Sequence, residues 1–159
     1  MKKTVCLLLS ILMLVALCAC DGGSTSKKSF GVTLDGVDVK IDAKAEPILA
    51  ALGSYSSYDQ SPTCAFEGFD KVYGYGDFEV ETYTMDGVEY IRAMHLLSDT
   101  CKTAEGISIG DTEEAVEKAY GDASSKTATA LTYEGDGMKL VFLLKDGKVA
   151  TVQYLKIED

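Results

Sequence analysis

His95 is the only histidine among the 159 residues, so any catalytic scheme built on an imidazole must use it. An imidazole can act as a general base or activate a serine or cysteine nucleophile. The sequence has no Gly-x-Ser-x-Gly elbow, phosphate-binding Gly-rich loop or His-Glu-x-x-His zinc motif to accompany it. Alternation places His95 on the polar, outward face of a predicted strand near a sheet edge. We therefore predict a solvent-facing histidine and a protein that is not an enzyme.

A second source of chemistry is the acidic side chains, which could bind a cation. Asp35, Asp38 and Asp42 lack the alternate-residue spacing and the closing glutamate of an EF-hand loop. We interpret Asp35 as a turn residue and Asp42 as a helix cap. The sequence predicts no metal and no cofactor.

Three glutamates are a weaker candidate for a calcium site. Glu79, Glu81 and Glu89 could face one another across a predicted hairpin. Like charges there would repel unless Lys71 or Arg92 intervenes. A solvated sheet face is the favoured interpretation, and a weak calcium site stays open as the alternative.

Aromatic residues are the better lead to a binding site. Four tyrosines fall in one predicted meander of three strands: Tyr73, Tyr75, Tyr83 and Tyr90. Tyrosine is favoured at recognition surfaces because it combines a stiff apolar ring with a polar tip. Alternation sends Phe78, Val80 and Thr82 to one face and leaves Tyr83 on the other. We predict that the four tyrosines mark a binding face, the alternative being ordinary half-buried strand residues.

Two cysteines, Cys64 and Cys101, lie in the predicted folded region. Cys64 precedes the first strand of the meander and Cys101 follows the third, so the two should lie at opposite ends of the sheet. At about 3.3 Å per strand residue their separation is roughly 20 Å or more. A disulfide needs Cα atoms within about 7 Å. We predict that both cysteines are unpaired.

Cys20 closes the run Leu17-Cys18-Ala19-Cys20 behind a short secretory signal. Lysines at positions 2 and 3 give a positive start, and residues 5–17 are apolar apart from one serine. This run resembles the lipobox of bacterial lipoproteins. The resemblance implies cleavage after Ala19 and a diacylglyceryl thioether on Cys20. Cys18 is the poorer candidate because the residue before it, Leu17, is bulky.

The charge balance excludes two classes of partner. The formal net charge is -10. The only charged residues within residues 1–19 are two lysines, so cleavage after Ala19 would leave a mature chain that is more acidic still. Such a surface repels nucleic-acid phosphates and anionic lipid headgroups. We therefore expect no nucleic-acid partner, and membrane attachment only through the acyl chains on Cys20.

The patterning predicts a signal peptide over residues 1–19, a flexible tether over 20–29 and a single domain over 30–159. Asp35-Gly36 predicts the turn of an N-terminal hairpin. After this hairpin the pattern indicates a tandem repeat, with copies over about 42–98 and about 107–157. Each copy begins with a helix, expected over 45–52 in the first copy and 112–120 in the second, and a glycine follows each helix. Three strands complete each copy. Strands are expected at 69–75, 78–84 and 88–97, and near 130–134, 138–144 and 149–156.

The fold class predicted from these elements is α+β. Two helix-plus-three-strand repeats and the N-terminal hairpin should form a mostly antiparallel sheet with both helices on one face. Asp111 is expected to cap the second helix, with Glu114 reaching back to it.

Several stretches together resemble a group of small uncharacterised lipoproteins of Gram-positive, Clostridia-like bacteria. They are residues 64–75, 78–83 and 105–111, the helix end Tyr120-Gly121, and the hairpin ahead of residues 43–53. The architecture also resembles the β-lactamase-inhibitor-protein and BamE-like folds. The resemblance implies a lipid-anchored module on the outer face of the cytoplasmic membrane that binds a protein or envelope component. The alternative is an inhibitor of an exported hydrolase such as a β-lactamase.

Overall fold

The computed structural model describes residues 30–62 and 68–157. Within these ranges the chain forms ten strands and two helices. In chain order they are β1 (Val32–Leu34), β2 (Val37–Val39), α1 (Ala45–Leu52), β3 (Ser57–Pro62), β4 (Phe69–Gly74), β5 (Phe78–Met85), β6 (Val88–Leu96), α2 (Glu113–Tyr120), β7 (Ser125–Lys126), β8 (Ala130–Gly135), β9 (Met138–Lys145) and β10 (Lys148–Lys156). None of the helices described is long and apolar enough to span a bilayer.

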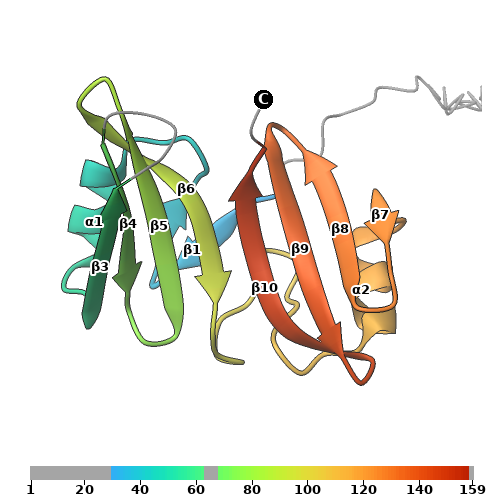
Figure 1. Ribbon diagram of the computed structural model, residues 1–159. Coiled ribbons are helices and arrows are strands. Elements are labelled where there is room, and N and C mark those ends of the chain that lie inside the picture. The colour runs from blue at the N-terminus through green and yellow to red at the C-terminus, as the bar shows by residue number, and fades with distance from the viewer. Residues whose placement is uncertain (1–29, 63–67, 158–159) are drawn as a thin grey trace, which may run out of the picture.

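Eight strands form one antiparallel sheet in the order β3-β4-β5-β6-β10-β9-β8-β7. Its two halves meet where β6 pairs with β10, from Leu96↔Val152 to Ala93↔Leu155. Both helices and the hairpin strand β1 lie behind the sheet in Figure 1, and none of the described elements covers the face toward the viewer. We name this uncovered side the open face.

The predicted fold class is wrong. About half of the described residues are in strands and only 13% are in helices, so the structure is mostly β. Each helix is followed by four strands rather than three, because β3 and β7 add an outer strand on either side. The N-terminal hairpin does not join the main sheet and forms a two-stranded sheet of its own.

Local sequence signals explain the turns. The Asp-Gly pairs at 35–36, 86–87 and 146–147 all have positive φ, for example 48° at Asp35 and 80° at Gly36. Positive φ at both central residues is the geometry of a two-residue hairpin turn whose twist matches the strands. The predicted turn role of Asp35 is therefore confirmed.

The predicted helix caps are wrong. Thr112 caps α2 by accepting a hydrogen bond from the backbone N–H of Ala115. Asp111 instead accepts one from the backbone N–H of Ser108 at 2.8 Å, which fixes the preceding loop. Lys44 occupies the cap position of α1, so Asp42 is free to contact residues of the main sheet.

The hydrophobic core lies between the sheet and the helices. The alternation predicted for β5 is confirmed, because Phe78, Val80 and Thr82 are fully buried. Beneath the other half of the sheet, Tyr120 of α2 packs against Tyr133 and Phe142, with ring centroids 5.2 and 5.3 Å away. The sheet is thus buried on its helix side and only half-buried on its open face, where β5 and β9 show regular alternation.

Candidate functional site

The four tyrosines predicted to form one binding face lie on two different faces. Tyr73 pairs with the core residue Val80 and is itself only 8% exposed. Tyr75 has the same orientation and stacks on Phe78, with ring centroids 4.9 Å apart. The sequence predicted strand β4 correctly. The register of β4 against β5 decides on which face of the sheet the tyrosines lie. Alternation within a single strand does not give that register.

Tyr83 and Tyr90 lie on the open face. They are directly paired across β5 and β6, and their rings are 5.7 Å apart. Both are half-buried. The predicted tyrosine face is therefore reduced to this pair.

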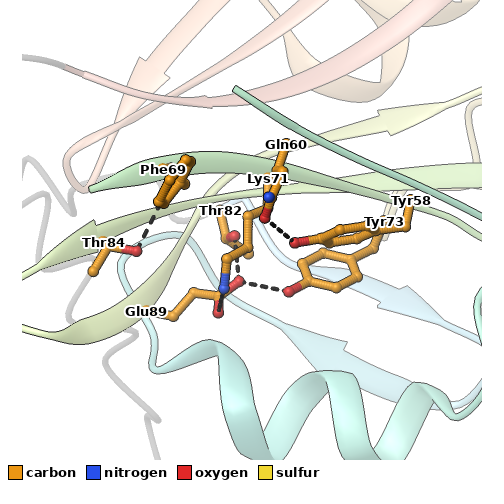
Figure 2. A network of polar contacts seen from close by, with 8 residues as sticks. All are labelled: Tyr58, Gln60, Phe69, Lys71, Tyr73, Thr82, Thr84 and Glu89. Atoms are coloured by element: carbon orange, nitrogen blue, oxygen red, sulfur yellow. Dashed lines mark hydrogen bonds and ion pairs between the residues drawn. The ribbon is translucent and has the colours of Figure 1, made fainter. Parts of the chain in front are cut away.

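Tyr73 belongs to a polar network on the helix side of the sheet, shown in Figure 2. At its centre, Glu89 of β6 accepts hydrogen bonds from three side chains. The donors are Lys71 Nζ at 2.6 Å, Tyr73 Oη at 2.9 Å and Thr82 Oγ1 at 2.5 Å. These donors come from β4 and β5, so the carboxylate joins three neighbouring strands.

The network keeps its charges fixed. Burial raises the pKa of Glu89, but the hydrogen bonds that it accepts lower it more, so the pKa lies below its ordinary value of 4.5. Burial, and then the bond to Glu89, raises the pKa of the Tyr73 phenol. An ionised carboxylate with three donors is a weak base, so this arrangement is suited to holding strands together.

His95 lies on the open face, as alternation predicted, but its side chain is only 15% exposed and it lies at the centre of the sheet, so the prediction of a solvent-facing histidine near a sheet edge is wrong. Strand β6 pairs with β5 on one side and β10 on the other. His95 Nε2 lies 2.9 Å from Glu81 Oε1, and His95 Nδ1 lies 3.2 Å from Gln153 Nε2. The hydrogen bond with His95 lowers the pKa of Glu81. Both ring nitrogens are thus engaged by neighbours on the sheet.

An irregularity in β6 adds a cation to the open face. The register of β6 against β5 shifts between the pairs of Glu81 and Thr82, which leaves Arg92 as an extra residue. Arg92 Nη1 lies 3.0 Å from Asp70 Oδ2 on β4. The bulge therefore lets a guanidinium group lie among the half-buried residues of this face.

A third contact group joins residues far apart in the sequence. Lys156 Nζ at the end of β10 lies 2.6 Å from Asp42 Oδ1 and 4.7 Å from the centre of the Tyr83 ring. The Tyr83 hydroxyl donates to Asp42 at 2.9 Å. Partial burial lowers the pKa of Lys156, but its bonds to Asp42 and Tyr83 raise it above its ordinary value. Tyr83 is thus held in one position by charged partners.

Apolar side chains extend the open face over β9 and β10. Leu143 is 38% exposed, and Val141 and Leu155 are half-buried. We name these residues, together with Tyr83, Tyr90, Arg92 and His95, the open-face surface. It combines aromatic, aliphatic and charged groups on strands that are rigidly paired.

The other predicted sites have these outcomes. Within residues 30–62 and 68–157, no group of three or more potential ligands could hold a metal ion. The expectation that Glu79, Glu81 and Glu89 face one another is wrong, because Glu89 lies on the helix side, where Lys71 pairs with it alone. Cys101 is a free cysteine. Cys20 and Cys64 lie outside the described residues.

A shallow pocket of about 530 Å³ lies at the start of α2. Its lining includes Glu113, Glu117 and Lys126. Lys126 Nζ lies 2.7 Å from Glu113 and 2.5 Å from Glu117, so the lysine of this pocket is already paired with two carboxylates.

No protein-family model matches the chain, and no curated protein matches it. Two solved structures are similar at low identity. One is an extracellular protein containing a SCP domain from Bacillus anthracis str. Ames, with a TM-score of 0.44 and 16% identity over 82% of this chain. This chain covers 49% of that protein, about half its length. The other is the uncharacterized protein yfeY from Escherichia coli, with a TM-score of 0.46, 13% identity, and coverage of 79% of this chain and 96% of that one. Similarities of this size establish neither a family nor a function.

Proposed function

We propose that this chain is a non-catalytic binding module, anchored by a lipid on Cys20 to the outer face of the cytoplasmic membrane. Its open-face surface engages a protein or another component of the envelope. The observation that carries the proposal is the uncovered face of the eight-stranded sheet, which bears Tyr83, Tyr90 and Leu143 among charged groups. The extracellular description of one structural neighbour is compatible with this location and adds no support to it.

The chemistry of this surface suits recognition. Tyrosine and arginine are enriched among the residues that dominate binding energy, and charged groups fix the orientation of a partner. Tyr83 is already restrained by Asp42 and Lys156. Side chains that are ordered before binding lose little conformational entropy when a partner arrives.

His95 supports binding more than catalysis. A general base must reach the proton that it abstracts, or reach it through one water molecule. Here both imidazole nitrogens are engaged, by Glu81 and by Gln153. An imidazole in this position links β5, β6 and β10 through its contacts with Glu81 and Gln153.

The experiment that tests the proposal is capture from crosslinked cells with two matched variants. Leu143→Glu places a charge on the open face, and Lys118→Glu changes the exposed side of α2. Both sites are exposed, so neither change should affect stability by more than about 0.5 kcal/mol. We expect Leu143→Glu to lose a partner that the wild type and Lys118→Glu retain.

Equal capture by all three proteins would contradict the assignment of the site. The identity of a captured partner decides between the two functions considered from the sequence. An exported hydrolase, slowed when the purified chain is titrated into it, would establish an inhibitor. A structural protein or polymer of the envelope would establish an adaptor.

A further inference from the structure

Strand β3 is an open edge of the main sheet. It pairs with β4 from Ser57↔Gly74 to Pro62↔Phe69, and no other strand in the described ranges pairs with it. All six of its residues are exposed. The opposite edge, β7, is only two residues long, and a very short edge strand is a common protection against pairing with another chain. The sheet therefore leaves one long edge available.

The hydrogen-bond alternation identifies which backbone groups of β3 are free. The backbone N–H of Tyr75 donates to the backbone oxygen of Phe78 at 2.9 Å, at the start of β5. In an antiparallel sheet the backbone groups of alternate residues point to opposite neighbours. The backbone groups of Val72 therefore point toward β3. Val72 pairs with Asp59, so the backbone groups of Asp59 are used within the sheet. The N–H and C=O groups of Tyr58 and Gln60 consequently point outward. They are positioned to bind an added strand.

The side chains beside these groups differ on the two faces. Tyr58 and Tyr55 are 43% and 48% exposed, and their rings lie 5.7 Å apart. Both rings also contact Tyr73, at 5.3 Å between centroids (Tyr58 and Tyr73 are drawn in Figure 2). On the opposite face, the carboxylate of Asp59 has no ion pair or hydrogen bond with any described residue. An added strand would place one side chain beside the tyrosines and the next beside Asp59.

We propose that β3 is a docking edge for an extended peptide segment of a partner protein. The segment would carry an apolar residue beside Tyr58 and a lysine or arginine beside Asp59. Main-chain hydrogen bonds supply affinity in this mode of recognition, and alternate side chains supply specificity. Charge favours such a partner over a second copy of this chain, because a copy would bring another Asp59 and another surface from a chain of net charge -10 to the same edge. Asp59 lies on the open face, but neither it nor Tyr58 is among the residues of the open-face surface.

The test uses full-length protein purified from membranes in detergent. The probe is a fluorescent peptide of alternating isoleucine and lysine, about seven residues long. A control probe has the same sequence with N-methyl groups on the amides of both hydrogen-bonding edges, so that neither edge can donate to β3. Fluorescence anisotropy gives the dissociation constants. We expect the unmethylated probe to bind and the methylated probe to lose binding.

Gln60→Pro removes one outward N–H without breaking the β3–β4 ladder, since proline is tolerated where the N–H faces solvent. We expect this variant to bind the probe about tenfold more weakly, the effect of about one hydrogen bond, and Gln60→Ala to bind like the wild type. Unchanged unfolding midpoints show that the variants are folded. If Gln60→Pro does not fold, Asp59→Lys replaces it and should weaken binding of the lysine probe while strengthening that of an isoleucine–glutamate probe.

Absence of binding to the wild type would overturn the proposal, as would equal binding of the methylated and unmethylated probes. A concentration-dependent dimer in sedimentation that Gln60→Pro abolishes would also overturn it, because the occupant of the edge would then be a second copy.

Discussion

Glu89 is an ionised carboxylate that side chains from two neighbouring strands hold in place. Its partners, Lys71, Tyr73 and Thr82, satisfy it inside a partly buried site. Removing one member of such a network leaves the others unsatisfied, which costs more than the net value of the bonds. The residue thus contributes to stability through strand pairing, and Tyr73 contributes with it instead of contacting a partner.

Glu89→Gln tests this role. The amide keeps the shape of the side chain but loses its charge, leaving Lys71 and Tyr73 with a poorer acceptor. We expect the free energy of unfolding to fall by about 1–3 kcal/mol in urea denaturation. Glu134→Gln is the control, because the exposed pair of Glu134 with Lys139 should contribute under about 1 kcal/mol. Equal losses in the two variants would contradict the role of the network.

The lowered pKa of Glu89 and of Glu81 predicts a pH dependence. A carboxyl whose pKa is lower in the folded state binds fewer protons there than in the unfolded chain. Its contribution to stability is therefore present above the ordinary pKa of 4.5 and is lost as the pH falls through the folded value. We expect the unfolding midpoint to fall steadily below pH 4.5, and to fall less steeply in Glu89→Gln. A midpoint that is independent of pH in this range would contradict the assignment.

At the scale of elements, the sequence was informative wherever apolar side chains alternate or an Asp-Gly turn occurs, but not for the helix caps. Helix α1 was predicted at its observed bounds, and six of the strands within a residue or two, because apolar alternation and Asp-Gly turns mark them. The pattern does not predict strand β3, because Ser57 to Pro62 are exposed throughout and show no alternation of apolar and polar residues. Strand β7 has only two residues. Both depend on backbone pairing with a neighbour that single-strand patterns do not contain.

The cap of α2 gives a prediction at this scale. Thr112→Ala should lower the free energy of unfolding by about 1 kcal/mol, since the N–H of Ala115 loses the Thr112 hydroxyl as an acceptor and keeps only the backbone oxygen of that residue. Thr112→Ser retains a hydroxyl and should restore most of that loss in thermal unfolding. Failure of serine to restore stability would mean that the threonine acts by packing rather than by capping.

For the whole molecule, the proposed lipid anchor and the folded domain can be tested separately. The strand order brings both halves of the chain into one sheet and leaves one face uncovered, whereas Cys20 lies outside the described residues. Cys20→Ala should move the protein from the membrane fraction to the soluble fraction, because the acyl chains would be lost. Cys18→Ala is the matched control and should stay with the membrane. Retention of both variants at the membrane would contradict lipidation at Cys20.

The open face is the surface on which the proposed binding function depends, and position-specific photo-crosslinking in intact cells tests it. A photoreactive residue at Leu143 or Tyr90 reports on the open face, and one at Lys118 reports on the exposed side of α2. We expect a discrete covalent adduct from each of the two open-face positions and none from position 118. An adduct from position 118 alone, or no adduct at Leu143 and Tyr90, would show that the open face is not the binding surface.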